Sequence, residues 1–241
     1  MLPLLAHCDW STSPPSRWIC IARPVDAKYR ISSPEPVGPF QTLFTRLRFS
    51  YPAGPILAAF DFPIGLPRSY AQKAGITSFS QAIRTFGFNQ CTNFYTPASK
   101  PEDISLTRPF YPAEPGGTKK QHLADGLGLK TASDLLRICD QKTSYRQAAC
   151  EIFWTLGANQ VGHAAICGWR DMLEPALLQN QIVLWPYDGE LQDLLNAGHI
   201  IVAESYPGET YSHLGLARFF GKTTQAGRQG QAPRILQWCT A

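Results

Sequence analysis

The segment that decides the fold is PILAAFDFPIGLP, residues 55–67. Its first half is an apolar run that ends in an acid, Asp61. Pro63, Gly65 and Pro67 follow at once, and such residues stop a strand abruptly. The segment therefore predicts a short buried strand that delivers a carboxylate to the edge of a sheet.

Two further segments repeat this pattern. LLAHCD (4–9) ends in Asp9, and HIIVAE (199–204) ends in Glu204. In open α/β sheets, functional sites gather at the carboxyl ends of the strands. If the three strands are neighbours, their three carboxylates converge at one end of the sheet.

Converging carboxylates repel one another, so their pKa values rise unless a cation neutralises them. Mg²⁺ or Mn²⁺ suits such a cluster, since Mg²⁺ takes hard oxygen ligands and keeps several waters. Two ions about 4 Å apart activate a water and stabilise the leaving oxygen in phosphodiester cleavage. We therefore predict a metal site on Asp9, Asp61 and Glu204. A lone acid at a strand end is more often a turn or cap residue, and a structural role for these acids is the alternative.

Strands come first along the chain and then alternate with helices, which predicts an α/β fold with a mixed sheet. We expect strands at residues 4–9, 17–23, 28–32, 55–61, 181–186 and 199–204. We expect helices at residues 39–49, 68–74, 78–86, 119–139 in two pieces, 159–179, 189–197, 209–216 and 233–239. Residues 87–118 lack periodicity and form an irregular insertion, which is usually functional or mobile. Residues 1–241 are expected to form a single domain.

Composition limits the class of protein. A chain of 241 residues is long enough for one large domain or two small ones. Its net charge of +4 is compatible with a nucleic-acid partner. Seven scattered cysteines form no CxxC pair, which indicates free thiols in a reducing compartment. No apolar run is long enough to span a membrane, and no secretory leader is recognisable. We therefore expect a cytoplasmic protein that does not bind membranes, and the sequence identifies no protein partner.

The segments DWS (9–11), DFPIGLP (61–67) and AESYPGETY (203–211) together resemble a widespread family of predicted RNase H-like nucleases. Members show an acid on the first strand, a D-x-P-x-G motif after a later strand, and an E-x-Y-P-x-E motif further on. The resemblance implies the RNase H fold, a five-stranded mixed sheet flanked by helices. It also implies a carboxylate metal site and nuclease activity.

The chain departs from that pattern at its end. Nucleases of this fold usually add a last acid from a C-terminal helix, and residues 235–241 (ILQWCTA) hold none. Either Glu209 takes that role, or the sequence is truncated, or the site is incomplete. Glu209 is therefore a fourth catalytic candidate, and an acid at a helix N-terminus is the alternative reading of it.

A basic, glycine-containing stretch, residues 221–234, predicts a mobile loop that contacts phosphates through Lys222, Arg228 and Arg234. An ordinary solvated surface is the alternative. The leading hypothesis is a divalent-metal-dependent phosphodiester hydrolase that acts on nucleic acid. One alternative is a phosphotransferase of the actin-like superfamily, with DWSTS (9–13) as a phosphate-binding hairpin. The other is a non-catalytic binding module of the same fold.

Overall fold

The computed structural model describes the whole chain except residues 158–160, 217–223 and 241. Contacts between residues divide it into two compact units. Unit 1 comprises Met1–Cys139 and Cys150–Ser205, and unit 2 comprises Asp140–Ala149 and Tyr206–Ala241. The single domain expected from the sequence stays a prediction.

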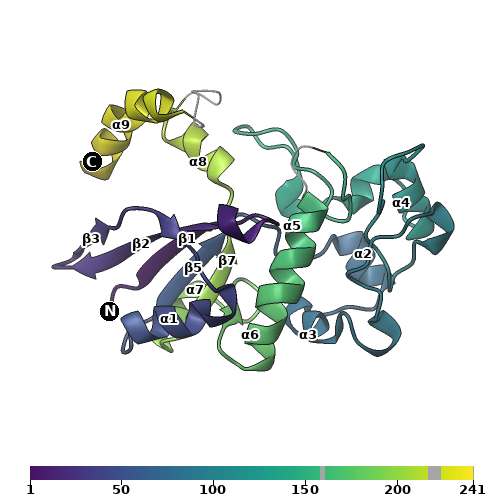
Figure 1. The fold of residues 1–241 in the computed structure, drawn as a ribbon, viewed down its shortest axis with the longest axis horizontal. Coiled ribbons are helices and arrows are strands. Elements are labelled where there is room, and N and C mark those ends of the chain that lie inside the picture. The colour runs from purple at the N-terminus through teal and green to yellow at the C-terminus, as the bar shows by residue number, and fades with distance from the viewer. Residues whose placement is uncertain (158–160, 217–223, 241) are drawn as a thin grey trace. The chain divides into compact units, whose positions relative to one another are not determined.

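Unit 1 is built on a seven-stranded mixed sheet with the order β3-β2-β1-β5-β7-β6, and β4 pairs with β2 (Figure 1). The strands are β1 (Leu4–Asp9), β2 (Trp18–Val25), β3 (Lys28–Ile31), β4 (Glu35–Pro36), β5 (Ile56–Phe60), β6 (Val183–Leu184) and β7 (Ile200–Glu204). β1, β2 and β3 are antiparallel neighbours, whereas β1, β5, β7 and β6 run parallel. The expected α/β class is confirmed. The resemblance implied five strands, and the sheet has two more, each of two residues. β6 falls within the strand expected at 181–186, whereas β4 was not expected.

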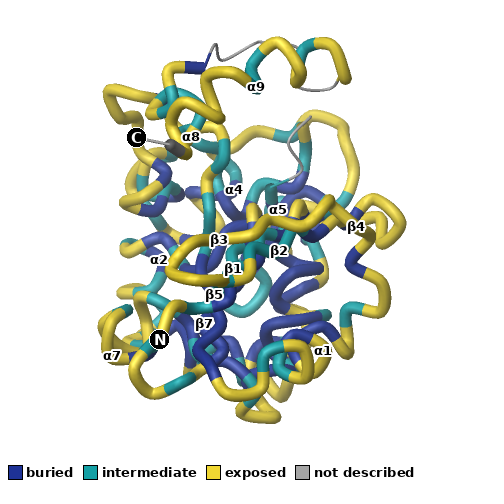
Figure 2. The backbone as a smooth tube through the Cα atoms, turned by 90° about the vertical axis from the view of Figure 1, so that its left-hand side faces the viewer, coloured by how far each residue is buried: buried dark blue, intermediate teal, exposed yellow. Residues whose placement is uncertain are grey.

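The central strands follow from their period-two pattern. In β1, Leu4, Ala6 and Cys8 are buried, while the residues between them are partly or fully exposed. β5 repeats this alternation, and β7 is buried over most of its length (Figure 2). Helix α1 (Leu43–Ser50) covers the buried face, where the rings of Phe44 and Phe60 lie 6.3 Å apart.

The helix expected at 159–179 is present from residue 161 to residue 178, in three parts. α5 (Val161–Gly168) passes through a π-helical turn (Trp169–Leu173) into α6 (Glu174–Leu178). The wide turn ends two residues before Pro175, which has no N–H to donate to a preceding carbonyl. Pro175 thereby occupies the first turn of α6, where the missing N–H costs little.

The remaining helices of unit 1 are short. They are α2 (Arg68–Lys73), α3 (Phe79–Ala82), α4 (Lys120–Gly126) and α7 (Leu191–Asn196). The second helical piece expected within 119–139 consists of 3₁₀ turns only, at Ala132–Leu135 and Ile138–Asp140.

The irregular segment 87–118 belongs to the core of unit 1. Its regular structure is limited to 3₁₀ turns and isolated bridges. Its aromatic side chains are nevertheless buried, among them Phe94 and Phe110. The ring of Phe94 stacks on that of Phe86 at 3.7 Å. Aromatic packing therefore holds this segment where a hydrogen-bonded ladder is missing.

Unit 2 contains α8 (Pro207–His213) and α9 (Gln225–Thr240). The sequence predicted a loop through residues 221–234, and the part from Gln225 onward is helical instead. Thr224 accounts for this difference, because its hydroxyl accepts the N–H of Gly227, three residues further on. This is the pattern of a helix N-cap, and it outweighs the two glycines and Pro233 that favoured a loop.

Candidate functional site

The strand register brings Asp9 and Asp61 together. β1 and β5 are parallel, with Cys8 opposite Phe60, and each aspartate is the next residue along its chain. Equivalent positions on paired strands project to the same face of a sheet. The carboxyl of Asp9 acts on that of Asp61 both through its charge and through a side-chain hydrogen bond. Two of the three carboxylates predicted for the metal site are therefore neighbours.

The surroundings of Asp61 disfavour the ionised form of its carboxyl. Its Oδ1 accepts the backbone N–H of Trp10 at 2.7 Å, which favours the ionised form. Desolvation by the surrounding protein favours the neutral form more strongly than this hydrogen bond favours the ionised form, although Asp61 keeps contact with solvent. The charge of the nearby Asp9 carboxyl also favours the neutral form. Together they raise the pKa of Asp61 to about 6. Near neutral pH, a bound cation would relieve this repulsion.

Glu204 lies apart from the two aspartates. It pairs with Phe60, one position before Asp61, so the alternation of the strands directs it to the opposite face. Its carboxylate accepts two hydrogen bonds from the Arg137 guanidinium, at 2.5 and 2.8 Å. The N–H of Ile64 donates to the same carboxylate at 2.7 Å. The Arg137 side chain is only 6% exposed, so Glu204 is the partner of a buried cation.

These contacts decide which residues suit a hard cation. Asp9 and Asp61 offer carboxylate oxygens at one end of the sheet, as Mg²⁺ and Mn²⁺ require. Glu204 does not belong with them, because it lies on the opposite face and the buried Arg137 guanidinium already neutralises its charge. Over residues 1–157, 161–216 and 224–240, no three His, Cys, Asp or Glu side chains gather as a cation site. A cation here would take two protein ligands and complete its shell with water.

Sequence reasoning missed two polar residues on the same face. His7 precedes Asp9 by two positions, and Ser205 follows Glu204, so both project to the side of the aspartates. His7 Nε2 and Ser205 Oγ lie 2.9 Å apart. Burial lowers the pKa of His7, and the charge of Asp9 partly opposes this. A period-two count along LLAHCD could have found His7, whereas Ser205 needed the strand pairing.

The D-x-P-x-G segment is held in a fixed loop. The Pro63 carbonyl accepts the indole N–H of Trp169 at 2.7 Å, and the Ile64 carbonyl accepts the Tyr187 hydroxyl at 3.0 Å. Gly65 has φ +121°, and a Cβ there would lie 1.8 Å from the Tyr187 hydroxyl oxygen. The glycine is therefore required both for its backbone angle and for its lack of a side chain.

The turn after β1 is held by a buried cation. Arg17 is 2% exposed, and its guanidinium lies 4.0 Å from the centroid of the Trp10 ring. Its Nε donates to the Ser11 carbonyl at 2.7 Å. Because the N–H of Trp10 donates to Asp61, this turn also orients the carboxylate.

Glu209 belongs to unit 2, in the first turn of α8. It accepts hydrogen bonds from Arg146 Nε at 2.9 Å and from the Thr143 hydroxyl at 3.2 Å. The hydrogen bond from Arg146 is the main reason that the pKa of Glu209 lies below its usual range. These contacts agree with the alternative reading of Glu209 as an acid at a helix N-terminus.

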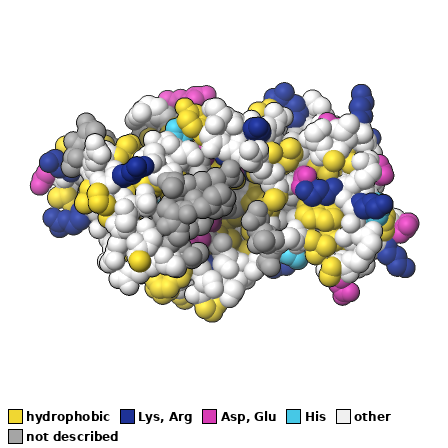
Figure 3. Space-filling model, turned by 90° about the horizontal axis from the view of Figure 1, so that it is seen from above, with side chains coloured by type: hydrophobic (Ala, Val, Ile, Leu, Met, Phe, Trp, Pro, Cys, Tyr) yellow, Lys and Arg dark blue, Asp and Glu magenta, His cyan; other side chains and the backbone are white. Residues whose placement is uncertain are grey.

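Of the three basic candidates, Lys222 lies outside the described residues. Arg228 and Arg234 both belong to α9. The Arg234 guanidinium donates to the Gly215 carbonyl, just after α8. On the face seen in Figure 3, Lys and Arg side chains (dark blue) occur singly or in small groups. Any phosphate contact by Arg228 or Arg234 would therefore come from a helix rather than from the loop expected.

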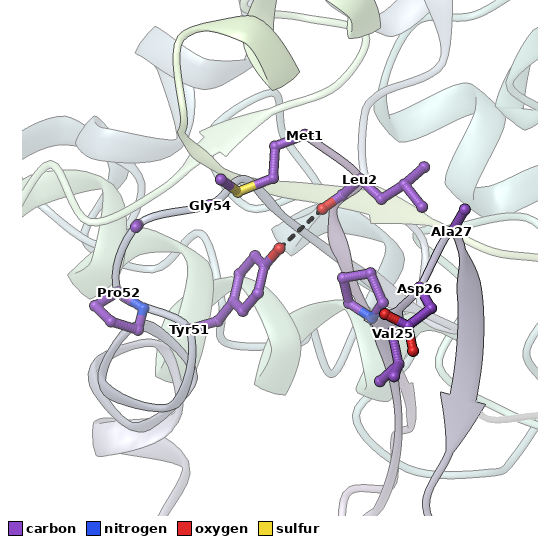
Figure 4. Close-up of a pocket in the computed structure, with 10 residues that line it drawn as sticks. Met1, Leu2, Val25, Asp26, Ala27, Tyr51, Pro52 and Gly54 are labelled. Atoms are coloured by element: carbon purple, nitrogen blue, oxygen red, sulfur yellow. Dashed lines mark hydrogen bonds between the residues drawn. The ribbon is translucent and has the colours of Figure 1, made fainter.

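A cavity lies at the other end of the strands. It has a volume of about 430 Å³ and is lined by Met1 and Leu2, the β2–β3 turn and residues 51–54 (Figure 4). The Tyr51 hydroxyl donates to the Leu2 carbonyl beside it. Met1 and Leu2 precede β1, and residues 51–54 precede β5, whereas Asp9 and Asp61 lie at the carboxyl ends of these strands. The cavity is therefore not part of the candidate site.

Fold and site define a mixed α/β protein with paired carboxylates where its central parallel strands end. Comparison with family models, curated proteins and solved structures finds no match for this chain. Among the residues described, no helix combines the length and apolar character needed to cross a bilayer.

Proposed function

We propose that this chain is a divalent-cation-dependent phosphodiester hydrolase that acts on nucleic acid. The observation that carries the proposal is the pairing of Asp9 and Asp61 at the ends of adjacent parallel strands. Keeping two carboxylates this close costs free energy, because each disfavours the charge of the other. A divalent cation offsets that cost and gains two hard oxygen ligands.

We also propose an RNase H-like fold. The five strands β3-β2-β1-β5-β7 supply a mixed sheet of the kind that the resemblance implies. The three motif acids, Asp9, Asp61 and Glu204, lie at or just after the ends of β1, β5 and β7. This placement supports the assignment independently of any matching relative.

Each residue of the site has a distinct task in this proposal. Asp9 and Asp61 hold the cation, which when bound supplies a Lewis acid and lowers the pKa of a coordinated water. The Trp10 N–H orients Asp61. His7, hydrogen-bonded to Ser205, places an imidazole on the same face, where it can accept a proton. Glu204 is not a ligand of the cation in this proposal. It accepts hydrogen bonds from Arg137 and from the N–H of Ile64, and so fixes the loop after Asp61.

Substitution of Asp61 by Asn tests the proposal. Asn keeps the shape and the acceptor for Trp10 but removes the charge that binds the cation. We expect Asp61→Asn to lower Mn²⁺-dependent cleavage of labelled oligonucleotides by at least about 100-fold. Millimolar Mn²⁺ should raise the melting temperature of the wild type and leave that of the variant unchanged.

The matched control is Glu114→Gln, which neutralises an exposed acid outside the site. It should retain both cleavage and stabilisation by Mn²⁺. A wild-type melt indifferent to Mn²⁺, with no cleavage, would favour the non-catalytic binding module instead. Stabilisation by ATP would favour the phosphotransferase.

A further inference from the structure

The excess positive charge of the chain falls in unit 2. Its segments of 10 and 36 residues hold six Lys and Arg against two Asp and Glu, a net charge of +4. Unit 1 holds the other 16 basic and 16 acidic residues and has no net charge. A partner that is attracted electrostatically therefore has unit 2 as its natural target.

Two tyrosines of unit 2 are exposed to solvent, in addition to Trp238 of α9. Tyr145 is 52% exposed and Tyr206 is 43% exposed. The ring of Tyr145 packs against His213, with centroids 4.3 Å apart. The Arg146 guanidinium lies 4.6 Å from the centroid of Tyr206. Each ring has a partner on one side, and each tyrosine is about half exposed, so a planar ligand can reach both side chains.

Several hydrogen bonds fix the position of Arg146, which contacts the Tyr206 ring. Arg146 is 8% exposed, and its Nη1 donates to the backbone carbonyls of Asp140, Gln141 and Gln147. Its Nε donates to Glu209 in α8. These bonds tie the 140–149 segment to α8, so little conformational freedom is lost when a ligand stacks on the rings.

A second tie joins the same two elements. The hydroxyl of Ser212, in α8, donates to the Tyr145 carbonyl at 3.1 Å. Glu209 faces Arg146, so its negative charge is balanced where a phosphate would approach. The surface made by Tyr145, Tyr206, Arg146 and His213, termed here the tyrosine surface, is thus aromatic, and its Arg146–Glu209 pair adds no net charge.

Open aromatic faces within a basic unit suit unpaired nucleobases. Every base has a π face that can stack on tyrosine, and phosphates supply the matching negative charge. In a duplex those base faces are already stacked on one another, so such rings distinguish single strands from duplexes. We propose that the tyrosine surface binds single-stranded nucleic acid. Resting on the proposed function, this makes a single strand the substrate class of the hydrolase.

Binding of a fluorescein-labelled 16-nucleotide oligo(dT) to the full-length chain tests the proposal, with anisotropy measured in excess EDTA. Without divalent cations, binding is read separately from cleavage. Tyr145→Leu and Tyr206→Leu keep apolar bulk but remove the ring, and each should raise the Kd by about 5- to 150-fold. Tyr145→Phe and Tyr206→Phe keep the ring and should stay within about twofold of wild type.

Three further measurements separate stacking from general effects. Tyr29→Leu changes a tyrosine of similar exposure in unit 1 and should leave the Kd unchanged. The salt dependence of binding should also be the same in wild type and Leu variants, because no phosphate contact is removed. A duplex of equal length should bind more weakly than the single strand, with a Kd that the Leu substitutions do not alter.

Photocrosslinking keeps the proposal testable if a Leu variant fails to fold. Wild-type protein irradiated with an oligonucleotide that carries 5-iodouracil should form adducts on Tyr145 or Tyr206, mapped by mass spectrometry. Adducts confined to unit 1, or Leu variants that fold and bind like wild type, would overturn the proposal. If these variants lose binding but the wild type cleaves nothing, the proposed function fails and this inference stands. If the wild type cleaves duplexes but not single strands, the proposed function stands and this inference fails.

Discussion

Glu204 shows how much the partner of a carboxylate matters. It ends β7 as Asp9 ends β1, and both follow an apolar run. Asp9 faces another carboxylate, whereas Glu204 faces the buried guanidinium of Arg137. The first arrangement costs free energy until a cation binds, and the second is neutral within the protein. Acids at the ends of two parallel strands of one sheet thus carry different chemistry, because they differ by one position in register and lie on opposite faces.

Glu204→Gln should destabilise the protein. It removes the negative charge that the Arg137 guanidinium contacts at 2.5 Å, and the Arg137 side chain is only 6% exposed. Because Glu204 keeps some solvent contact, we expect a loss of about 2–4 kcal/mol in the free energy of unfolding, measured by urea denaturation. Asp103→Asn is the control, since its 3.8 Å contact with Arg108 is more exposed and should be worth less than about 1 kcal/mol. An unchanged urea midpoint together with lost Mn²⁺ binding would make Glu204 a ligand after all.

The raised pKa of Asp61 predicts a pH dependence. Its folded-state pKa of about 6 exceeds the ordinary 3.8, so the folded protein binds this proton more tightly than the unfolded chain. The contribution of Asp61 to stability is therefore greatest below about pH 4 and falls as the pH rises toward 6. Asp61→Asn removes this term, so the variant should gain stability relative to wild type between pH 4 and pH 7.

Urea midpoints of both proteins across that pH range, without divalent cations, measure the effect. The change should occur below about pH 6 and level off above it, because both states are then ionised. Curves that stay parallel from pH 4 to pH 7 would show that the carboxyl titrates normally.

Among the elements, the β2–β3 turn carries backbone strain. Asp26 and Ala27 both have positive φ, at 48° and 62°. A two-residue turn with both φ values positive matches the right-handed twist of the strands and favours Asn or Asp followed by Gly. Asp26 fits this preference, but the Cβ of Ala27 crowds the backbone in this conformation.

Ala27→Gly should therefore stabilise the protein, by about 0.5–1 kcal/mol. The opposite result is expected of Ala22→Gly, within β2, where glycine only adds freedom to the unfolded chain and should cost about 0.5–1 kcal/mol. Thermal melts of the two variants compare these changes directly. Destabilisation by both would show that the turn holds Ala27 without strain.

At the scale of the whole molecule, charge and candidate chemistry belong to different units. Unit 1 has no net charge and holds Asp9, Asp61, His7 and Ser205. Unit 2 carries the net charge of +4 and the tyrosine surface. The proposed binding and the proposed hydrolysis therefore depend on different residues, which is why the oligonucleotide and cleavage experiments have independent outcomes.

The sequence by itself determined the strands and the positions of their acids. A period-two alternation and an abrupt Pro or Gly are local signals, so β1, β5 and β7 could be located from the residues alone. The pairing of Asp9 with Asp61 followed from one assumption, that the strands are neighbours. The boundaries of α9 were missed, although Thr224 carried a local capping signal for its start.

Only the tertiary structure decided which carboxylate is left for a cation. Glu204 and Arg137 are 67 residues apart, and His7 and Ser205 are 198 apart. No local pattern couples such residues, because their contact depends on the strand order and on the path of the irregular segments. A carboxylate at a strand end is a site or a structural partner according to the charge that the fold brings beside it, and that charge comes from elsewhere in the chain.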